Sequence, residues 1–268
     1  MSFSIAGKTA VVTGAANGVG LSIARHFVQA GANVMFADMD EARLTDEVGK
    51  REDDDGSSAY FVGDLREKLT VANLLSATID RFDQVDILVN ASRQMVSADP
   101  LNADDDAVAM LIEQNLMTSL RVTQLFAKRM IKQAKGAEDQ APVGSIINLS
   151  SIAARRTQPQ LLAYSVSSAA LDQMTRSMAV ALAPNRIRVN AIALGSVMSA
   201  SLKGALQEEN GMRDQIIGST PLGRIASPTE LADVAQFLAS DGSSFVTGQI
   251  LTVDGGRTLV DAADAPAH

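Results

Sequence analysis

The sequence predicts a single-domain α/β protein in which helices cover both faces of a seven-stranded parallel sheet. Three observations support this fold class. The 268 residues suit one domain with a large buried core. Short runs rich in Val, Ile and Leu alternate with longer segments of helical periodicity, and no Pro- or Ser-rich linker divides the chain. We expect the domain to span residues 1–260, followed by a flexible C-terminal tail at 261–268.

The apolar runs are the predicted strands. In chain order they are KTAVVT (8–13), NVMFA (33–37), SAYFV (58–62), DILVN (86–90), GSIINLS (144–150), RIRVNAI (186–192) and QILTV (249–253). Apolar residues at helical spacing predict helices near 18–30, 40–50, 66–82, 104–133, 161–182 and 228–240, and a less regular one within 201–217. Helices that join parallel strands by right-handed crossovers produce a doubly wound sheet.

Composition excludes several kinds of site. The chain has no cysteine, and its two histidines are His26, in the first predicted helix, and the terminal His268. Disulfides, thiolate nucleophiles and a metal site are therefore not expected. The net charge of −8, without a Lys/Arg run, argues against a nucleic-acid partner. Because no apolar run is long enough to span a membrane and the first strand begins near Lys8, we expect a soluble, cytoplasmic protein.

A glycine-rich turn joins the first predicted strand to the first helix. It reads TGAANGVG, Thr13 to Gly20. Gly14 permits a tight turn, Gly18 lets the backbone approach a pyrophosphate, and Gly20 allows the helix to pack closely on the sheet. The N-terminus of that helix offers N–H donors and positive potential to an anion. The turn indicates a dinucleotide site in a Rossmann-type fold, and the alternative is an ordinary glycine-rich connection.

An acidic residue, Asp38, ends the second predicted strand. A carboxylate at this position accepts hydrogen bonds from the hydroxyls of an adenosine ribose and repels the additional phosphate of NADP. We therefore expect NAD as the cofactor, with NADP less favoured. The alternative is that Asp38 caps the helix that starts near Asp40, since Asp is a preferred N-cap residue.

Four motifs in succession carry a resemblance to a known family. TGxxxGxG at 13–20, LVN at 88–90, SS at 150–151 and a following Tyr164 resemble the classical short-chain dehydrogenase/reductases over nearly the whole chain. The resemblance implies an NAD(P)-dependent oxidoreductase that forms homodimers or homotetramers through the helices near 104–133 and 161–182. It also implies cofactor contacts from Gly14, Asn17, Gly18, Val19, Gly20, Asp38, Asp64, Leu65, Asn90, Tyr164 and Val197.

By the same resemblance, Asn115, Ser151 and Tyr164 are the expected catalytic residues. Tyr164 would act as acid or base and Ser151 would polarise the substrate oxygen, which suits the interconversion of a secondary alcohol and a ketone. Asn115 would hold a water in a proton relay, or alternatively would be a buried polar residue at a helix kink. The closing run Thr247 to Gly256 is expected to be mainly structural.

The family pattern is broken at two places. Where it has a lysine four residues after the tyrosine, this chain has Ser168, and its NNAG segment here reads NASR, residues 90–93. A free phenol titrates near 10, and a nearby cation typically lowers such a pKa by about 1 to 3 units. Loss of the cation therefore raises a proton-transfer barrier by roughly 1.4 to 4 kcal/mol. Arg93, Arg155 and Arg156 are the candidates to replace it.

Two functions follow from these observations. The first is an NAD-dependent oxidoreductase acting on a small-molecule carbonyl or alcohol substrate. The second is a non-catalytic dinucleotide-binding protein, a sensor or regulatory subunit that kept the cofactor turn and lost the chemistry. Ser151, Tyr164 and Asn115 favour the enzyme, whereas Ser168 and the NASR segment favour the second reading. The stretch from Gly195 to Thr220, with charged and apolar residues mixed at helical spacing, is expected to cover the pocket as a mobile lid.

Overall fold

A single parallel sheet forms the centre of the molecule. The computed structural model describes residues 3–49, 56–135, 142–208 and 211–261. Its strands pair in the order β3-β2-β1-β4-β5-β6-β7, and every pairing is parallel. They are β1 (Thr9–Thr13), β2 (Asn33–Asp38), β3 (Ser58–Val62), β4 (Ile87–Asn90), β5 (Gly144–Ser151), β6 (Ile187–Leu194) and β7 (Ile250–Val253). The predicted fold class and all seven strands are confirmed.

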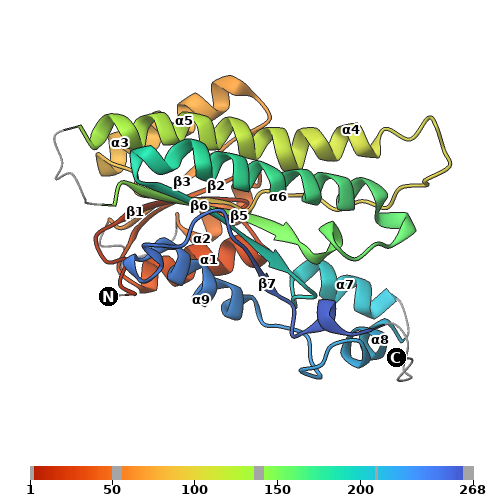
Figure 1. Ribbon diagram of the computed structural model, residues 1–268. Coiled ribbons are helices and arrows are strands. Elements are labelled where there is room, and N and C mark those ends of the chain that lie inside the picture. Colours follow the sequence, from red (N-terminus) through yellow and green to blue (C-terminus); the bar gives the residue numbers. More distant parts are fainter. Residues whose placement is uncertain (1–2, 50–55, 136–141, 209–210, 262–268) are drawn as a thin grey trace.

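Helices cover both faces of this sheet (Figure 1). One face carries α1 (Gly18–Gln29) and α9 (Pro228–Ala239), which pack against each other, and the other carries α3 (Lys68–Phe82), α5 (Thr118–Gln133) and α6 (Leu162–Leu182). Neighbouring strand residues face opposite layers, so Val12 belongs to the α1–α9 core and Val11 to the other core. This double burial explains why the strands read as continuous apolar runs.

The helix expected at 104–133 is not continuous. It begins as α4 (Ala107–Leu111), widens into a π-helical segment at Ile112–Met117, and continues as α5. The later start has a local cause, because the Asp105 carboxylate accepts hydrogen bonds from the N–H groups of Asp99 and Ala107 and holds a turn there. At the start of α5, the hydroxyls of Thr118 and Ser119 donate to the backbone carbonyls of Glu113 and Asn115 in the π segment. Such wide turns are rare and occur frequently at functional sites.

Two other helices also differ from expectation. The segment 201–217 holds two short helices, α7 (Ala200–Glu208) and α8 (Met212–Gly218), and α8 begins after Gly211, whose φ is +88°. A positive φ is incompatible with a continuous helix and suits glycine. The helix expected at 40–50 is α2 (Glu41–Glu47). Residues 262–268 of the predicted tail lie outside the described residues.

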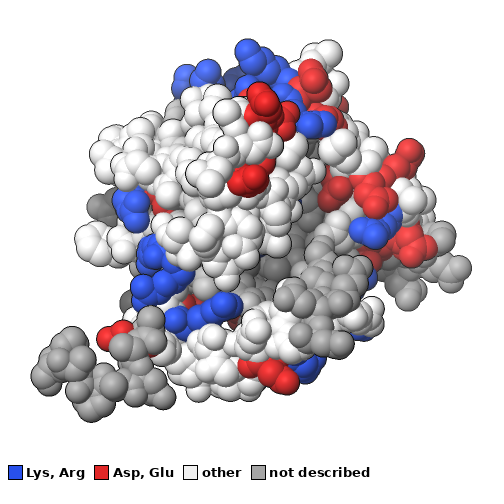
Figure 2. Space-filling view, turned by 90° about the vertical axis from the view of Figure 1, so that its right-hand side faces the viewer, with Lys and Arg blue, Asp and Glu red and all other residues white. Residues whose placement is uncertain are grey.

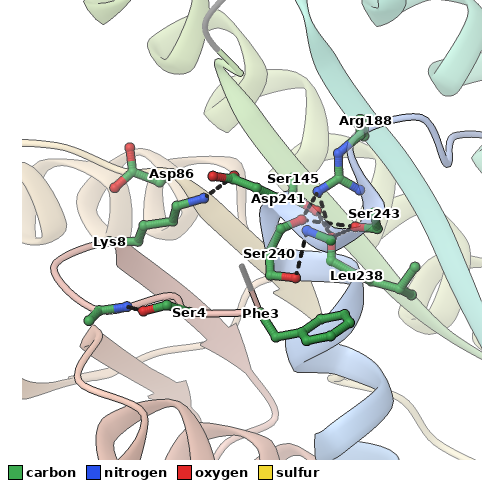
Figure 3. Close-up of polar contacts among 12 residues, drawn as sticks. Phe3, Ser4, Lys8, Asp86, Ser145, Arg188, Leu238, Ser240, Asp241 and Ser243 are labelled. Atoms are coloured by element: carbon green, nitrogen blue, oxygen red, sulfur yellow. Dashed lines mark hydrogen bonds and ion pairs between the residues drawn. The ribbon is translucent and has the colours of Figure 1, made fainter. Parts of the chain in front are cut away.

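The amino ends of the strands are closed by polar contacts (Figure 3). Arg188, at the start of β6, donates hydrogen bonds to the carbonyls of Leu238 (2.7 Å) and Ser240 (3.2 Å) at the end of α9. Ser145, at the start of β5, donates to the same Leu238 carbonyl at 2.8 Å. Burial lowers the pKa of Arg188, and Asp241 opposes that effect. Basic groups here complement the negative end of the α9 dipole.

The opposite, carboxyl edge of the sheet has a switch point. From β1 the chain winds outward through β2 and β3, and it returns to β4 on the other side of β1 before winding outward again to β7. The loops after β1 and β4 therefore leave in opposite directions and border a crevice, where open α/β sheets bind their ligands. Among the described residues, no helix is long and apolar enough to cross a membrane.

Candidate active site

A cleft of about 1010 Å³ opens along the carboxyl ends of the strands. This volume is at the upper end of the range for pockets that bind drug-sized ligands. Eleven of the thirteen predicted site residues line it, and they lie at the ends of β2 and β5, in the loops after β1, β3 and β6, and on the first turns of α1 and α6. These are Gly14, Asn17, Gly18, Val19, Gly20, Asp38, Asp64, Leu65, Ser151, Tyr164 and Val197. The two that do not line it are Asn90 and Asn115.

The glycine turn presents open backbone to this cleft. Gly14 has a φ of +66°, and a Cβ added to it would lie 2.7 Å from the Ala91 carbonyl oxygen, so only glycine fits. At Gly18, whose φ is +57°, the nearest atom to an added Cβ is that of Ser199 at 3.8 Å. Gly14 is therefore needed for packing between loops. Gly18 instead leaves space on the cleft side, which a Cβ would fill.

The first turn of α1 has N–H groups without a side-chain cap. Asn17 is the N-cap residue, with extended backbone, but its side chain makes no capping hydrogen bond. The first N–H groups of a helix have no intrahelical acceptor and carry positive potential. Together with the space beside Gly18, this arrangement fits the pyrophosphate of a dinucleotide.

Asp38 lies beside the glycine turn. Its Oδ2 accepts a hydrogen bond from the Ala16 N–H at 3.1 Å, and its Oδ1 accepts from the N–H groups of Met39 (2.7 Å) and Asp40 (3.1 Å). The N-cap of α2 is Asp40, whose carboxylate accepts from the Arg43 N–H at 3.0 Å. The capping alternative considered for Asp38 therefore applies to Asp40. The Asp38 carboxylate holds the glycine turn and lines the cleft.

Asp64 follows β3 and lines the same part of the cleft. Both of its oxygens accept hydrogen bonds from the Arg66 guanidinium, at 2.5 to 3.0 Å. This pairing lowers the pKa of Asp64 and keeps its carboxylate charged.

Ser151 and Tyr164 reach the cleft from neighbouring elements. Ser151 is the last residue of β5, and its Oγ accepts a hydrogen bond from the Ala153 N–H at 3.1 Å. That bond uses a lone pair and leaves the hydroxyl hydrogen free to donate. Tyr164 lies on the first turn of α6 and is 4% exposed. Ser168, one turn further along α6, is also buried.

Asn115 lies in the π segment and holds the loop that follows β4. Its Oδ1 accepts from the Gln94 N–H at 2.8 Å, while its Nδ2 donates to the Gln94 carbonyl at 2.9 Å and to Ser167 Oγ at 3.2 Å. These contacts use its amide hydrogens within the protein. A buried polar side chain at a distorted helix was the alternative for this residue, and the structure shows that geometry. The water-relay role stays a prediction.

Asn90 and Val197 are placed differently from one another. The Asn90 side chain is buried and donates to Thr123 Oγ1 (3.0 Å) and Asn148 Oδ1 (2.8 Å), so it joins β4 to α5 and β5. Val197 follows β6, lines the cleft and forms an isolated bridge with Ala226. A cofactor contact from Asn90 would therefore have to come from its backbone.

Three arginines also line the cleft. They are Arg93, Arg156 and Arg257. Arg155 instead turns toward β7, where its guanidinium donates to Thr252 Oγ1 at 3.2 Å, so that candidate cation does not face the site. Arg257 was missed in the sequence because it follows the closing glycine pair, a run expected to be structural. The turn is held by Asp254, which accepts hydrogen bonds from the N–H groups of Gly256 and Thr258.

Comparisons with known proteins agree on the family. A family model described as enoyl-(acyl carrier protein) reductase matches residues 14–258. The chain is 33% identical over 256 residues to a 3-oxoacyl-(acyl-carrier-protein) reductase of Thermotoga maritima, covering 94% of this chain and 98% of that protein. It is 34% identical over 261 residues to a cis-4-hydroxycyclohexanecarboxylate dehydrogenase of Sinomonas cyclohexanicum, covering 97% and 100%.

Solved structures give the same result. A gluconate 5-dehydrogenase from Burkholderia cenocepacia, in complex with NADP and tartrate, superimposes with a TM-score of 0.87 at 30% identity, covering 97% of this chain and 98% of that one. A 7α-hydroxysteroid dehydrogenase, in complex with NADH and 7-oxo glycochenodeoxycholic acid, has a TM-score of 0.86 at 30% identity, covering 95% of each chain. These neighbours bind NADH or NADP, so a nicotinamide dinucleotide is the cofactor class.

Proposed function

Because the chain belongs to the short-chain dehydrogenase/reductase family and is an NAD(P)-dependent oxidoreductase of that type, we propose that it interconverts a secondary alcohol and a ketone with NAD(H). The observation that carries this proposal is a single cleft that holds Asp38 together with Ser151 and Tyr164. The first is suited to an adenosine ribose, and the other two are suited to a substrate oxygen.

Different residues of the cleft would hold the cofactor and act on the substrate. The glycine turn and the uncapped first turn of α1 would hold the pyrophosphate, and Asp38 would bind the ribose hydroxyls. A bound nicotinamide supplies or accepts the hydride. Tyr164 would exchange a proton with the substrate oxygen, and the Ser151 hydroxyl, already accepting from Ala153, would donate to that oxygen.

NAD is proposed over NADP because of charge. Asp38 and Asp64, the acids that line the cleft in the described residues, follow adjacent strands β2 and β3. A 2′-phosphate on the adenosine ribose would meet this pair, and like charges repel. The gluconate 5-dehydrogenase similar to this chain binds NADP, and the assay below therefore compares both cofactors.

The test is an assay of NADH formation with purified protein and a panel of secondary alcohols, repeated with NADP. We expect turnover with NAD, at least about tenfold lower kcat/KM with NADP, and loss of turnover in Tyr164→Phe. NADH binding without hydride transfer on any substrate, in either direction, would contradict the enzyme and favour the non-catalytic dinucleotide-binding protein.

Assembly is proposed from the same family membership. We propose a homodimer or homotetramer that pairs the helices within 104–133 and α6. Several apolar side chains on these helices are exposed in the single chain, among them Val108, Met110, Val166 and Val180. Light scattering during size-exclusion chromatography gives the mass directly, and a monomer at micromolar concentration would contradict the proposal.

A further inference from the structure

We propose that Arg93 supplies the positive charge that acts on the Tyr164 phenol in this protein, an inference that rests on the proposed role of Tyr164. The Arg93 guanidinium carbon lies 5.6 Å from the centroid of the Tyr164 ring. One of its nitrogens donates to the Ser150 carbonyl at 3.0 Å, which holds the guanidinium next to the end of β5. Arg93, one of the residues that depart from the NNAG pattern, therefore lies over the ring of the expected acid or base.

The backbone on both sides of Arg93 is fixed by side chains. Before it, Thr13 Oγ1 accepts hydrogen bonds of 3.0 and 3.1 Å from two successive N–H groups of the loop after β4. After it, the Asn115 amide binds both the N–H and the carbonyl of Gln94. The backbone around Arg93 is therefore held on one side by β1, through Thr13, and on the other side by the π segment, through Asn115. We infer that Asn115 is a positioning residue for Arg93.

The surroundings leave the charge of Arg93 available to the phenol. Within the described part of the chain, Arg93 forms no ion pair with an Asp or Glu. Tyr164 belongs to a buried apolar cluster with Ala98, Ala107, Leu111, Ala153 and Ala163. Two other charged groups in this region are Arg156, which lines the same cleft, and Asp172, two turns further along α6. Tyr164 is itself buried, and electrostatic interactions are stronger where water is excluded.

Charge, and not proton transfer, is the action available to this residue. Arginine stays protonated and cannot exchange a proton in the reaction. A cation within about 4 to 6 Å stabilises the anionic form of an acidic group by the equivalent of about 1 to 3 pKa units. Ser168 stands where the family pattern has its lysine, and Arg93 reaches the same ring from a different strand. Ser168 and Arg93 together therefore amount to a change in the position from which a cation reaches Tyr164.

Ionisation of the phenol can be measured without any substrate. The chain has two tyrosines and no tryptophan, so in a Tyr60→Phe background the ultraviolet absorbance of phenolate reports on Tyr164 alone. If Arg93 acts on the phenol, phenolate should appear at higher pH in Arg93→Gln than in the parent, and the displacement should be smaller in Arg93→Lys. Gln keeps a donor for the Ser150 carbonyl but removes the charge. An unchanged midpoint in Arg93→Gln, with NADH affinity retained, would overturn the proposal.

Turnover provides the second readout. Arg93→Gln should lower kcat about 10- to 100-fold with the NADH dissociation constant within about threefold of the parent, and Arg93→Lys should recover most of the loss. Adding Ser168→Lys to Arg93→Gln should restore kcat to within about tenfold of the parent. Full activity in Arg93→Gln would overturn the proposal. If the parent transfers no hydride, the proposed function fails, while the phenolate titration still decides the role of Arg93.

The wall of the cleft that lies opposite Asp38 and Asp64 is lined by the basic residues Arg156 and Arg257. From the charge of this wall we infer that the substrate carries a carboxylate. This inference also rests on the proposed function. The lining acids follow β2 and β3, whereas Arg156 and Arg257 follow β5 and β7 at the other side of the sheet. In Figure 2 several basic side chains lie together at the lower left, while most side chains in the group at the right edge are acidic; both kinds also lie at the top of the view.

Both of these arginines contact only neutral acceptors among the described residues. Arg156 donates to the Thr258 carbonyl, and Arg257 donates to Ser196 Oγ at 3.0 Å. Neither has an acidic partner in that part of the chain. Arginine pairs with carboxylates through two parallel hydrogen bonds, which gives both affinity and orientation. A carboxylate on the substrate would be drawn to this wall, next to Ser151 and Tyr164.

The test compares hydroxycarboxylates with their neutral amides. We expect kcat/KM to be about 10- to 100-fold higher for the acid, and the ratio to fall toward one in the double variant Arg156→Met, Arg257→Met, through KM more than kcat. Calorimetric binding of the same acids and amides to the NADH complex gives a readout that needs no turnover. Equal binding and equal kcat/KM for acid and amide would overturn the inference.

Discussion

The two edges of the sheet use polar side chains in opposite ways. At the amino edge, Arg188, Ser145 and Ser243 all donate to the Leu238 carbonyl at the end of α9 (Figure 3). At the carboxyl edge, α1 begins at Gly18 with no side-chain cap from Asn17. The carbonyl of Leu238 at the end of α9 accepts several hydrogen bonds from the protein, whereas the first N–H groups of α1 have no side-chain acceptor from their N-cap and are open to a ligand.

This difference separates stability from function within one scaffold. Contacts at the amino edge join β5, β6 and α9, and none of the residues that make them lines the cleft described above. Contacts at the carboxyl edge, such as Thr13 and Asn115 with the loop after β4, hold side chains toward a cleft. Substitutions at the first edge should change unfolding, and substitutions at the second should change binding or turnover.

The largest effect is expected at Tyr164. Tyr164→Phe keeps the ring and its packing but removes the hydroxyl, so we expect kcat to fall about 10³-fold, or about 4 kcal/mol in the barrier, because general acid–base catalysis is lost. NADH binding by fluorescence and the unfolding midpoint serve as controls. Turnover within tenfold of the parent would assign the proton transfer to another group.

The next largest effect is expected at the amino edge. Arg188→Met removes a buried charged donor that contacts two carbonyls near the end of α9, and we expect the free energy of unfolding to fall by about 2 to 3 kcal/mol. The matched control is Lys8→Met, which breaks a partly exposed ion pair with Asp241 at the same edge and should cost no more than about 1 kcal/mol. Urea denaturation measures both. A larger fall in the free energy of unfolding for Lys8→Met than for Arg188→Met would contradict the prediction that Arg188 stabilises this edge more.

A third substitution changes cofactor preference at the carboxyl edge. Asp38→Ser removes the charge that would repel a 2′-phosphate and the acceptor for ribose hydroxyls. We expect the ratio of kcat/KM for NAD over NADP to fall about 10- to 100-fold, which corresponds to about 1.4 to 2.7 kcal/mol. Asp40→Ser, which affects the α2 cap and not the cleft, is the control and should leave the ratio unchanged.

The smallest effect is a pH dependence at the amino edge. Burial raises the pKa of Asp86, and the hydrogen bond from the Thr9 N–H (2.8 Å) opposes this only in part. The native state therefore holds this proton more tightly than the unfolded chain, and stability from this group is lost as pH rises from the ordinary carboxyl range through the raised value. Asp86→Asn should flatten the stability–pH curve there. An identical curve would show that Asp86 titrates normally.

Sequence patterns predicted the sheet well because the central strands, such as β1 and β4, are buried on both faces and read as continuous apolar runs. They also predicted the glycine turn between β1 and α1, where Gly14 and Gly18 have positive φ, whereas its contacts with a cofactor stay a prediction. They gave a helix kink at Asn115 only as an alternative, and they predicted neither its π-helical form nor the later start of the helix. The π segment depends on hydroxyl contacts from Thr118 and Ser119 and on the Asn115 contact with a loop distant in sequence, none of which changes apolar spacing.

The directions of long side chains could not be predicted from the sequence either. Arg93, Arg155 and Arg156 all looked equivalent in the sequence as loop cations near the site. In the structure Arg93 lies over Tyr164, Arg156 lines the cleft, and Arg155 turns to Thr252. Arg257 enters the cleft from a turn near the end of the described chain. Side-chain direction depends on the strand order, which local patterns do not contain.

The π segment also sets the direction in which side chains before it point relative to side chains after it on the same long helix. A regular α-helix turns about 100° for each residue, so a wide turn that accommodates one extra residue rotates everything after it relative to everything before it. Asn115 can therefore point at the loop after β4 while Phe126 and Met130 still point into the core. Deleting one residue between Ile112 and Met117 would make the helix regular, and it would force either the amide or the core face out of alignment.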